Sequence, residues 1–97
     1  MSNNEQHQLP PTSIWQQIAK LSITEDKPIM LDYWIDSLEK KVLIGVKEDD
    51  EKLLVKNAEE YTSPISKIYQ LENTYIIVTE NSIYITSNTI DKRRISS

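Results

Sequence analysis

The stretch that decides the fold runs from Leu53 to Thr86 and reads LLVKNAEEYTSPISKIYQLENTYIIVTENSIYIT. Ile, Val and Tyr alternate there with polar residues, and short polar segments interrupt the alternation. This pattern is typical of antiparallel strands that bury one face of a sheet. It predicts a mainly β domain, either a small barrel or a curled meander, which the earlier segments of the chain help to close.

The turns in and around this stretch set the predicted number of strands. We expect strands at 29–36, 42–46, 53–62, 65–71, 75–79 and 83–86. Glu80 to Ser82 is predicted to be a turn, because Asn tolerates the left-handed backbone conformation and Ser can bond its own backbone. Glu72 to Thr74 is either a hairpin turn, which gives six strands, or a bend in one long strand, which gives five.

A short α-helix is predicted before the strands. Ile14, Ile18 and Leu21 recur at helical spacing and form one apolar face over about two turns. Thr12 or Ser13 is suited to cap the beginning of this helix. A helix this short is not stable by itself, so it must dock on another surface. It either covers an open end of the barrel, which we expect, or binds a partner.

A polar connection at 22–27 leads to the first predicted strand, Ile29 to Asp36. Alternate residues of that strand are apolar, which places Met30 and Trp34 on its nominally outer face. These two large side chains either pack under the helix or form an exposed patch that marks a contact between subunits.

The second predicted strand contains Gly45, the single glycine of the chain. A glycine within a strand often marks a bend or a close backbone approach. The acidic run Glu48 to Glu51 follows as a hairpin tip. It lacks the alternating ligands and the turn glycine of a calcium-binding loop, so we expect a solvated turn.

The chain is expected to form one domain with a tail at each end. Residues 1–10 are polar and are predicted to be disordered, residues 11–88 form the folded domain, and residues 89–97 form a flexible basic tail. Lys92, Arg93 and Arg94 in this second tail are either simply solvated or contact an acidic partner or a phosphate.

Composition narrows the class of protein. The chain has no cysteine, its net charge is −4, and no apolar run approaches the length of a membrane span. Its beginning lacks the basic start and apolar core of a secretory signal, so we expect an intracellular, cytoplasmic protein in a reducing compartment, without membrane contact. Abundant Ile and Lys, whose codons are rich in A and T, are compatible with an accessory protein of a large DNA virus or phage.

The residues that catalysis requires are missing or badly placed. The only histidine, His7, lies in the predicted disordered tail, where nothing positions it as a base. Glu59 and Glu60 are neighbours on a predicted strand and point to opposite faces. Without cysteine or a structured histidine, a zinc site is not expected, and one glycine leaves no phosphate-binding loop. We therefore predict a protein that is not an enzyme and holds no metal or cofactor.

The order of elements resembles the Sm and Sm-like proteins. The resemblance rests on the helix led by a proline, on KPIML, on LLVKNAEEY and on the hairpin VTENSIYI, and it covers roughly 11–86. It implies a five-stranded Sm-like or SH3-like barrel with an N-terminal helix, which assembles into rings and binds single-stranded RNA. On the resemblance, the strands 75–79 and 83–86 are the edges that join subunits.

The sequence departs from that family at the positions that hold RNA. Lys41 stands near the glycine of the first motif, Lys52 stands near its base-binding asparagine, and Thr79-Glu80 replaces the basic residue and glycine of the second. The turn that would face RNA is the acidic run at 48–51. Like charge weakens binding to a phosphate strand, so the resemblance implies a barrel without the standard RNA site.

Two functions remain. The first is a small barrel that acts through protein–protein contacts, either by self-association or as an adapter. Its candidate contact residues are Met30, Trp34, Ile76, Val78 and Tyr84. The alternative is an Sm-like protein that binds single-stranded RNA through a local basic patch. The candidate patch residues are Lys40, Lys41, Lys92, Arg93 and Arg94.

Overall fold

The computed structural model describes residues 12–95 as a mainly β fold. Its elements are α1 (Thr12–Glu25), β1 (Ile29–Met30), α2 (Trp34–Leu38), β2 (Leu43–Val46), β3 (Lys52–Asn57), β4 (Glu60–Tyr61), β5 (Ile65–Leu71), β6 (Thr74–Thr79), β7 (Ile83–Ser87) and β8 (Asp91–Arg94). The strands form two four-stranded sheets, called here sheet A (β1-β7-β6-β5) and sheet B (β4-β3-β2-β8). These two sheets are not closed into a barrel.

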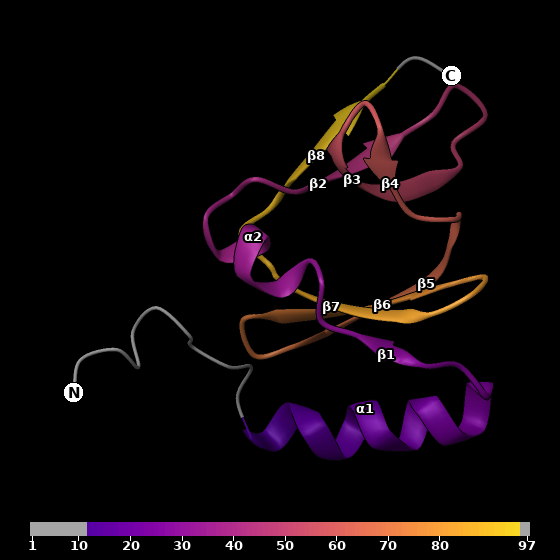
Figure 1. The fold of residues 1–97 in the computed structure, drawn as a ribbon, viewed down its shortest axis with the longest axis vertical. Helices are drawn as coiled ribbons and strands as arrows, with labels where there is room; N and C mark the ends of the chain where they lie inside the picture. The colour runs from indigo at the N-terminus through magenta and orange to yellow at the C-terminus, as the bar shows by residue number, and fades with distance from the viewer. Residues whose placement is uncertain (1–11, 96–97) are drawn as a thin grey trace.

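Sheet A lies between α1 and sheet B (Figure 1). This arrangement buries the strand β6, which is apolar on both faces. Ile76 and Val78 pack with Ile14 and Ile18 of α1, whereas Ile77 belongs to the core between the two sheets. A strand covered on both faces reads as a continuous apolar run and not as a strict alternation.

The predicted strand Ile29–Asp36 is wrong beyond Met30. The chain turns there and forms α2, in which the Ser37 N–H donates to the Tyr33 carbonyl (3.0 Å) and the Ser37 hydroxyl to the Trp34 carbonyl (2.6 Å). Apolar residues at 31, 34, 35 and 38 also fit helical spacing, so the pattern was ambiguous over this short range. The helical turn allows Trp34 to enter the core under α1 while Tyr33 enters the core between the sheets.

The helix α1 is longer than predicted and includes most of the expected connection at 22–27. It ends where Asp26 adopts a φ of 56° and the Ser22 hydroxyl donates to the Lys27 carbonyl (2.7 Å). Thr12 and Ser13 are already helical, and the Ser13 hydroxyl bonds to the Glu72 carboxylate (2.8 Å). The apolar face is confirmed, since Ile14 and Ile18 are fully buried.

The predicted strand 53–62 is interrupted after Asn57. The Asn57 side-chain oxygen accepts hydrogen bonds from the N–H groups of Glu59 (2.8 Å) and Glu60 (3.0 Å), which turns the chain into the short strand β4. This is the local backbone mimicry that makes asparagine a turn residue. Two of the remaining turns were predicted correctly: the acidic tip at 48–51 joins β2 to β3, and 80–82 joins β6 to β7. Of the two alternatives for 72–74, the hairpin turn is the one observed, and Glu72 and Asn73 form it between β5 and β6.

The tail predicted at 89–97 is wrong for 91–94, which form β8 beside β2. Ile90 is buried in the core between the sheets and anchors this strand, although the four residues of β8 are all charged. The pairs β1–β7 and β2–β8 are parallel, so the fold is not a simple antiparallel meander. Gly45 does mark a close approach, because a Cβ there would lie 2.7 Å from Ile95 Cδ1. The tail expected at 1–10 lies outside the described residues.

Candidate functional site

The residues predicted to contact a partner do not form one surface. Trp34, Ile76 and Val78 are 5%, 1% and 0% exposed and lie in the core under α1. For Trp34, the alternative of packing under the helix is therefore the one observed. Met30 is half-buried and pairs with Tyr84 across β1 and β7. Tyr84 lies against the core between the sheets, on the face of sheet A opposite to Ile76 and Val78.

The strands expected to be edges are interior strands. Residues 75–79 belong to β6 and 83–86 belong to β7, and these two strands lie between β1 and β5 in sheet A. The reason is that β1 pairs with β7 in parallel and covers the edge that a three-stranded meander would leave open. The long edge of this sheet is instead β5, at the other side.

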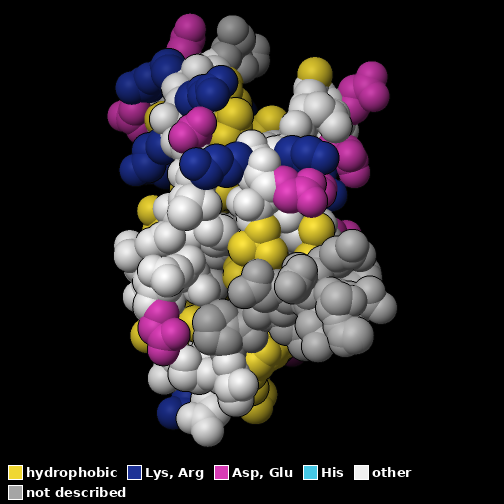
Figure 2. Space-filling view, turned by 90° about the vertical axis from the view of Figure 1, so that its left-hand side faces the viewer, with side chains coloured by type: hydrophobic (Ala, Val, Ile, Leu, Met, Phe, Trp, Pro, Cys, Tyr) yellow, Lys and Arg dark blue, Asp and Glu magenta, His cyan; other side chains and the backbone are white. Residues whose placement is uncertain are grey.

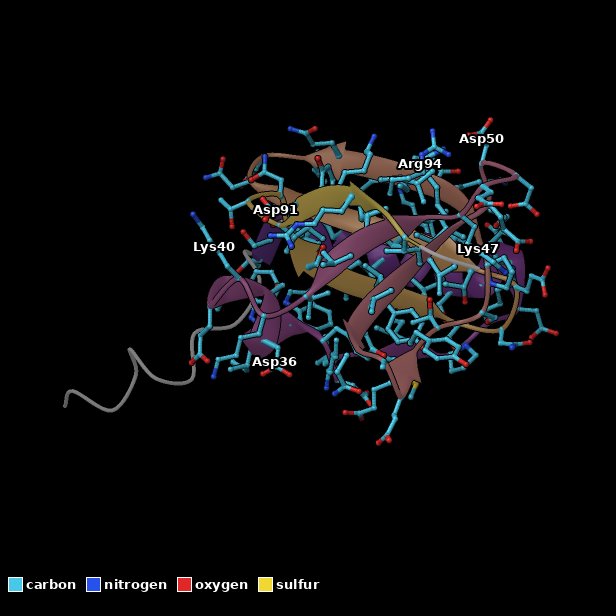
Figure 3. All side chains as sticks on the ribbon, turned by 90° about the horizontal axis from the view of Figure 1, so that it is seen from above. Asp36, Lys40, Lys47, Asp50, Asp91 and Arg94 are labelled. Atoms are coloured by element: carbon cyan, nitrogen blue, oxygen red, sulfur yellow. The ribbon has the colours of Figure 1, made fainter. Side chains whose placement is uncertain are left out.

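The four open edges of the two sheets differ greatly in length and chemistry. The edges β1 and β4 contain two residues each, and β8 consists of charged residues only. The edge β5 has seven residues, ISKIYQL, and five consecutive residues within it are exposed. Short or charged edges resist pairing with another chain, whereas a long edge with apolar side chains favours it. Figure 3 shows β5 as the outermost strand along the upper side of the view.

The side chains of β5 divide between the two faces of sheet A. Lys67 pairs with Val78 and Tyr69 pairs with Ile76, so both lie on the face that carries α1. Ile68 pairs with Ile77 and therefore lies on the opposite face. Ile68 and Tyr69 remain 36% and 40% exposed, so each face of β5 carries one exposed apolar side chain.

Two local features restrain the first part of β5. The register shifts between Ile65 and Lys67, and the Ser66 hydroxyl donates to the Val78 carbonyl (3.1 Å). Lys67 Nζ lies 3.1 Å from a carboxylate oxygen of Glu25 at the end of α1, and this hydrogen bond raises the pKa of Lys67. Beyond Lys67 the pairing with β6 is regular up to Leu71, so β5 offers a straight edge there.

A hollow of about 280 Å³ lies beside the beginning of β5. It is lined by Ile65 to Ile68 and by residues 50–52 of the turn between β2 and β3. Glu51 at this turn pairs with Lys47 (3.2 Å). The hollow therefore gives the edge open space on the side of sheet B.

The five basic residues predicted to bind RNA are spread along sheet B. Figure 3 places Lys40 near Asp91 at one end and Arg94 with Asp50 and Lys47 at the other. Basic and acidic side chains are interspersed over the upper part of Figure 2. Three of the five cations form ion pairs, which join Lys41 to Glu39 (3.0 Å), Arg93 to Asp91 (3.2 Å) and Arg94 to Asp50 (3.3 Å). The positive charge is locally compensated, which makes a poor site for a phosphate backbone.

A second apolar surface lies on the outer face of sheet B. A groove of about 420 Å³ is lined there mainly by Leu53, Val55, Tyr61 and Ile95. Tyr61 on the short edge β4 is 59% exposed. Like Tyr69 it is an exposed tyrosine, but it lies on the other sheet, so it serves as a control in experiments on β5.

No protein-family model, curated protein or solved structure matched this chain. Among residues 12–95, no group of three or more His, Cys, Asp or Glu side chains is arranged to hold a metal ion. Neither helix in the same range is both long and apolar enough to cross a membrane. Within the part of the chain that the structure describes, β5 is the longest sheet edge and carries exposed apolar side chains.

Proposed function

We propose that this protein is a non-catalytic binding module that accepts an extended segment of another polypeptide as an additional strand on β5. The observation that supports this is the contrast among the sheet edges. Three of them are short or fully charged, whereas β5 has seven residues and carries the exposed side chains of Ile68 and Tyr69.

Binding of this kind uses two sets of interactions. Backbone N–H and C=O groups on the free side of β5 pair with the incoming strand and supply affinity, while alternate side chains supply specificity. In the regular part of β5, the incoming strand would meet Tyr69 on the face of α1 and Ile68 on the face of sheet B. The apolar edge contacts would exclude water from the backbone hydrogen bonds.

The edge is held in place before binding. Its neighbour β6 is buried between α1 and sheet B, with Ile76, Ile77 and Val78 at most 1% exposed. A preformed edge loses little conformational freedom when a partner strand is added, which favours affinity. The alternative of RNA binding has weaker support, because most of its candidate cations are paired with carboxylates.

The experiment is selection from a phage-displayed library of random linear peptides long enough to pair with β5. We expect peptides with alternating apolar residues that bind the wild type and the Tyr61→Lys control equally. Ile68→Lys should weaken the same peptides by about tenfold, because a charge in the middle of an edge strand opposes pairing. Bound peptide should also slow hydrogen exchange of the backbone amides in β5.

Two results would refute the proposed function. The first is a selection that yields no peptide whose binding depends on Ile68. The second is a set of peptides whose binding is lost in Tyr61→Lys, since this would place the binding surface on the groove of sheet B. Circular dichroism and thermal unfolding of both variants confirm that they are folded, which is expected because both side chains are partly exposed.

A further inference from the structure

The sequence of β5 is complementary to itself when two copies are paired antiparallel. In such a pair, related by a two-fold axis perpendicular to the sheet, residues opposite each other lie on the same face. The axis must therefore pass midway between one residue and the same residue of the second copy. The candidates at the exposed centre of β5 are Lys67, Ile68 and Tyr69.

The three registers differ in the pairs they create. An axis at Lys67 places two lysines opposite each other, which is unfavourable. An axis at Tyr69 pairs the two tyrosines but places the apolar Ile68 opposite the polar Gln70 and the cationic Lys67 opposite the apolar Leu71. An axis at Ile68 places the two isoleucines in contact and each Lys67 opposite the Tyr69 of the second copy. Only this last register gives all three central residues, Lys67, Ile68 and Tyr69, a favourable partner, because it matches isoleucine with isoleucine and a cation with an aromatic ring.

We propose that the strand accepted by β5 is the β5 of a second copy of this chain, antiparallel and centred on Ile68. This inference rests on the proposed function and names its partner. The two copies of sheet A then form one continuous sheet. Because the axis is perpendicular to the sheet, both α1 helices lie on one face and both copies of sheet B lie on the other.

Contacts within a single copy already place the side chains of β5 as this pairing requires. Lys67 and Tyr69 share the face of α1, and Glu25 holds the Lys67 ammonium group there at 3.1 Å. The register shift at Ser66 ends the regular part of β5 at Lys67. The central pairs Lys67–Tyr69, Ile68–Ile68 and Tyr69–Lys67 all fall within the regular part. They cover the two exposed apolar side chains of β5 at once.

The test compares two substitutions of one residue by sedimentation equilibrium over a wide range of protein concentration. Tyr69→Lys places a lysine opposite each Lys67, whereas Tyr69→Glu places a carboxylate there. We expect Tyr69→Lys to raise the dissociation constant of the dimer about tenfold, because the symmetric interface contains the pair twice. We expect Tyr69→Glu to keep it within about threefold of wild type, because the new ion pair offsets the loss of the ring.

Tyr61→Lys is the matched control and should leave the dimer unchanged, since it makes the same substitution at an exposed tyrosine of sheet B. Hydrogen exchange gives a second measurement: the amides of β5 should exchange more slowly as protein concentration rises. Thermal unfolding shows whether each variant is folded.

Each other outcome overturns a definite part of the inference. A wild-type protein that stays monomeric at every concentration, while selected peptides still bind at Ile68, overturns the self-pairing and leaves the proposed function intact. A dimer that survives Tyr69→Lys, or that Tyr61→Lys abolishes, forms through another surface. Equal loss in Tyr69→Lys and Tyr69→Glu overturns the register, because an axis at Tyr69 brings like charges together in both variants. If the wild type forms no dimer and no selected peptide binds at Ile68, the proposed function itself is refuted.

Discussion

Two buried threonines of sheet A should respond in opposite directions to the same substitution. Thr86 in β7 and Thr79 in β6 are both fully buried. The Thr86 hydroxyl has no hydrogen-bond partner within the described part of the chain. The Thr79 hydroxyl accepts from the Ser82 N–H and donates to the Ser82 carbonyl, both at 3.1 Å. We predict that Thr86→Val stabilises the protein and Thr79→Val destabilises it.

The magnitudes follow from the state of each hydroxyl. Burying a hydroxyl without a partner costs about 1–3 kcal/mol, and valine keeps the branched shape that suits a strand. Thr86→Val should therefore raise the free energy of unfolding by about 1–2 kcal/mol. Thr79→Val removes the hydroxyl that satisfies the buried Ser82 N–H, which costs about 1–3 kcal/mol.

Urea unfolding at equilibrium measures both changes, and the slope of the transition should stay constant because the exposed surface hardly changes. Thermal unfolding provides a check, with a shift of about 4–8 °C for each kcal/mol in a domain of this size. If both substitutions change the free energy of unfolding in the same direction, the two hydroxyls do not differ in hydrogen bonding as described. A loss in Thr86→Val would mean that its hydroxyl is hydrogen-bonded in solution.

Two further predictions concern the junction of α2 with the sheets. Ser37→Ala should lower the free energy of unfolding by about 1–3 kcal/mol, because this buried hydroxyl accepts from the Ser87 N–H (2.8 Å) and the substitution leaves that donor unpaired. Ser13→Ala, at an exposed hydroxyl, should change it by less than about 0.5 kcal/mol, and equal losses in urea unfolding would contradict the argument. Burial, together with nearby negative groups, raises the pKa of Tyr33 from 10.0 to about 12, so the unfolded chain releases this proton first and stability falls as pH rises from 10 to 12. Titration of tyrosine absorbance in the wild type and in Tyr33→Phe measures this pKa. The two curves should differ by one phenolate that forms near pH 12, and a difference centred at pH 10 would contradict the raised pKa.

Local chemistry made several features predictable. The alternation in 53–86 correctly indicated a mainly β fold, and the turn at 80–82 followed from residues that act within a few positions of themselves. At 72–74 the sequence left a hairpin turn and a bend open, and the structure has the turn. The spacing of Ile14 and Ile18 likewise predicted the buried face of α1. These features depend on backbone preference and on the period of apolar residues, both of which are properties of a short window.

Other features were not predictable because they depend on distant pairing. The strand β8 is entirely charged, and only its parallel pairing with β2 and the buried Ile90 define it as a strand. The apolar pattern of 31–38 fits both a strand and a helical turn. The helical turn forms because it lets Tyr33 and Trp34 pack into two different cores.

The open edge shows the same division. From the sequence alone one can conclude that 65–71, 75–79 and 83–86 are extended and that a turn separates the last two, because that turn is encoded locally. The sequence left open whether 72–74 is a turn or a bend. The sequence does not show which of these strands is exposed, and the tertiary structure decides this by pairing β1 with β7 and covering both faces of β6. The edge residues Ile68 and Tyr69 became candidates only then. Exposure of a strand depends on what packs beside it, and that is a property of the whole fold.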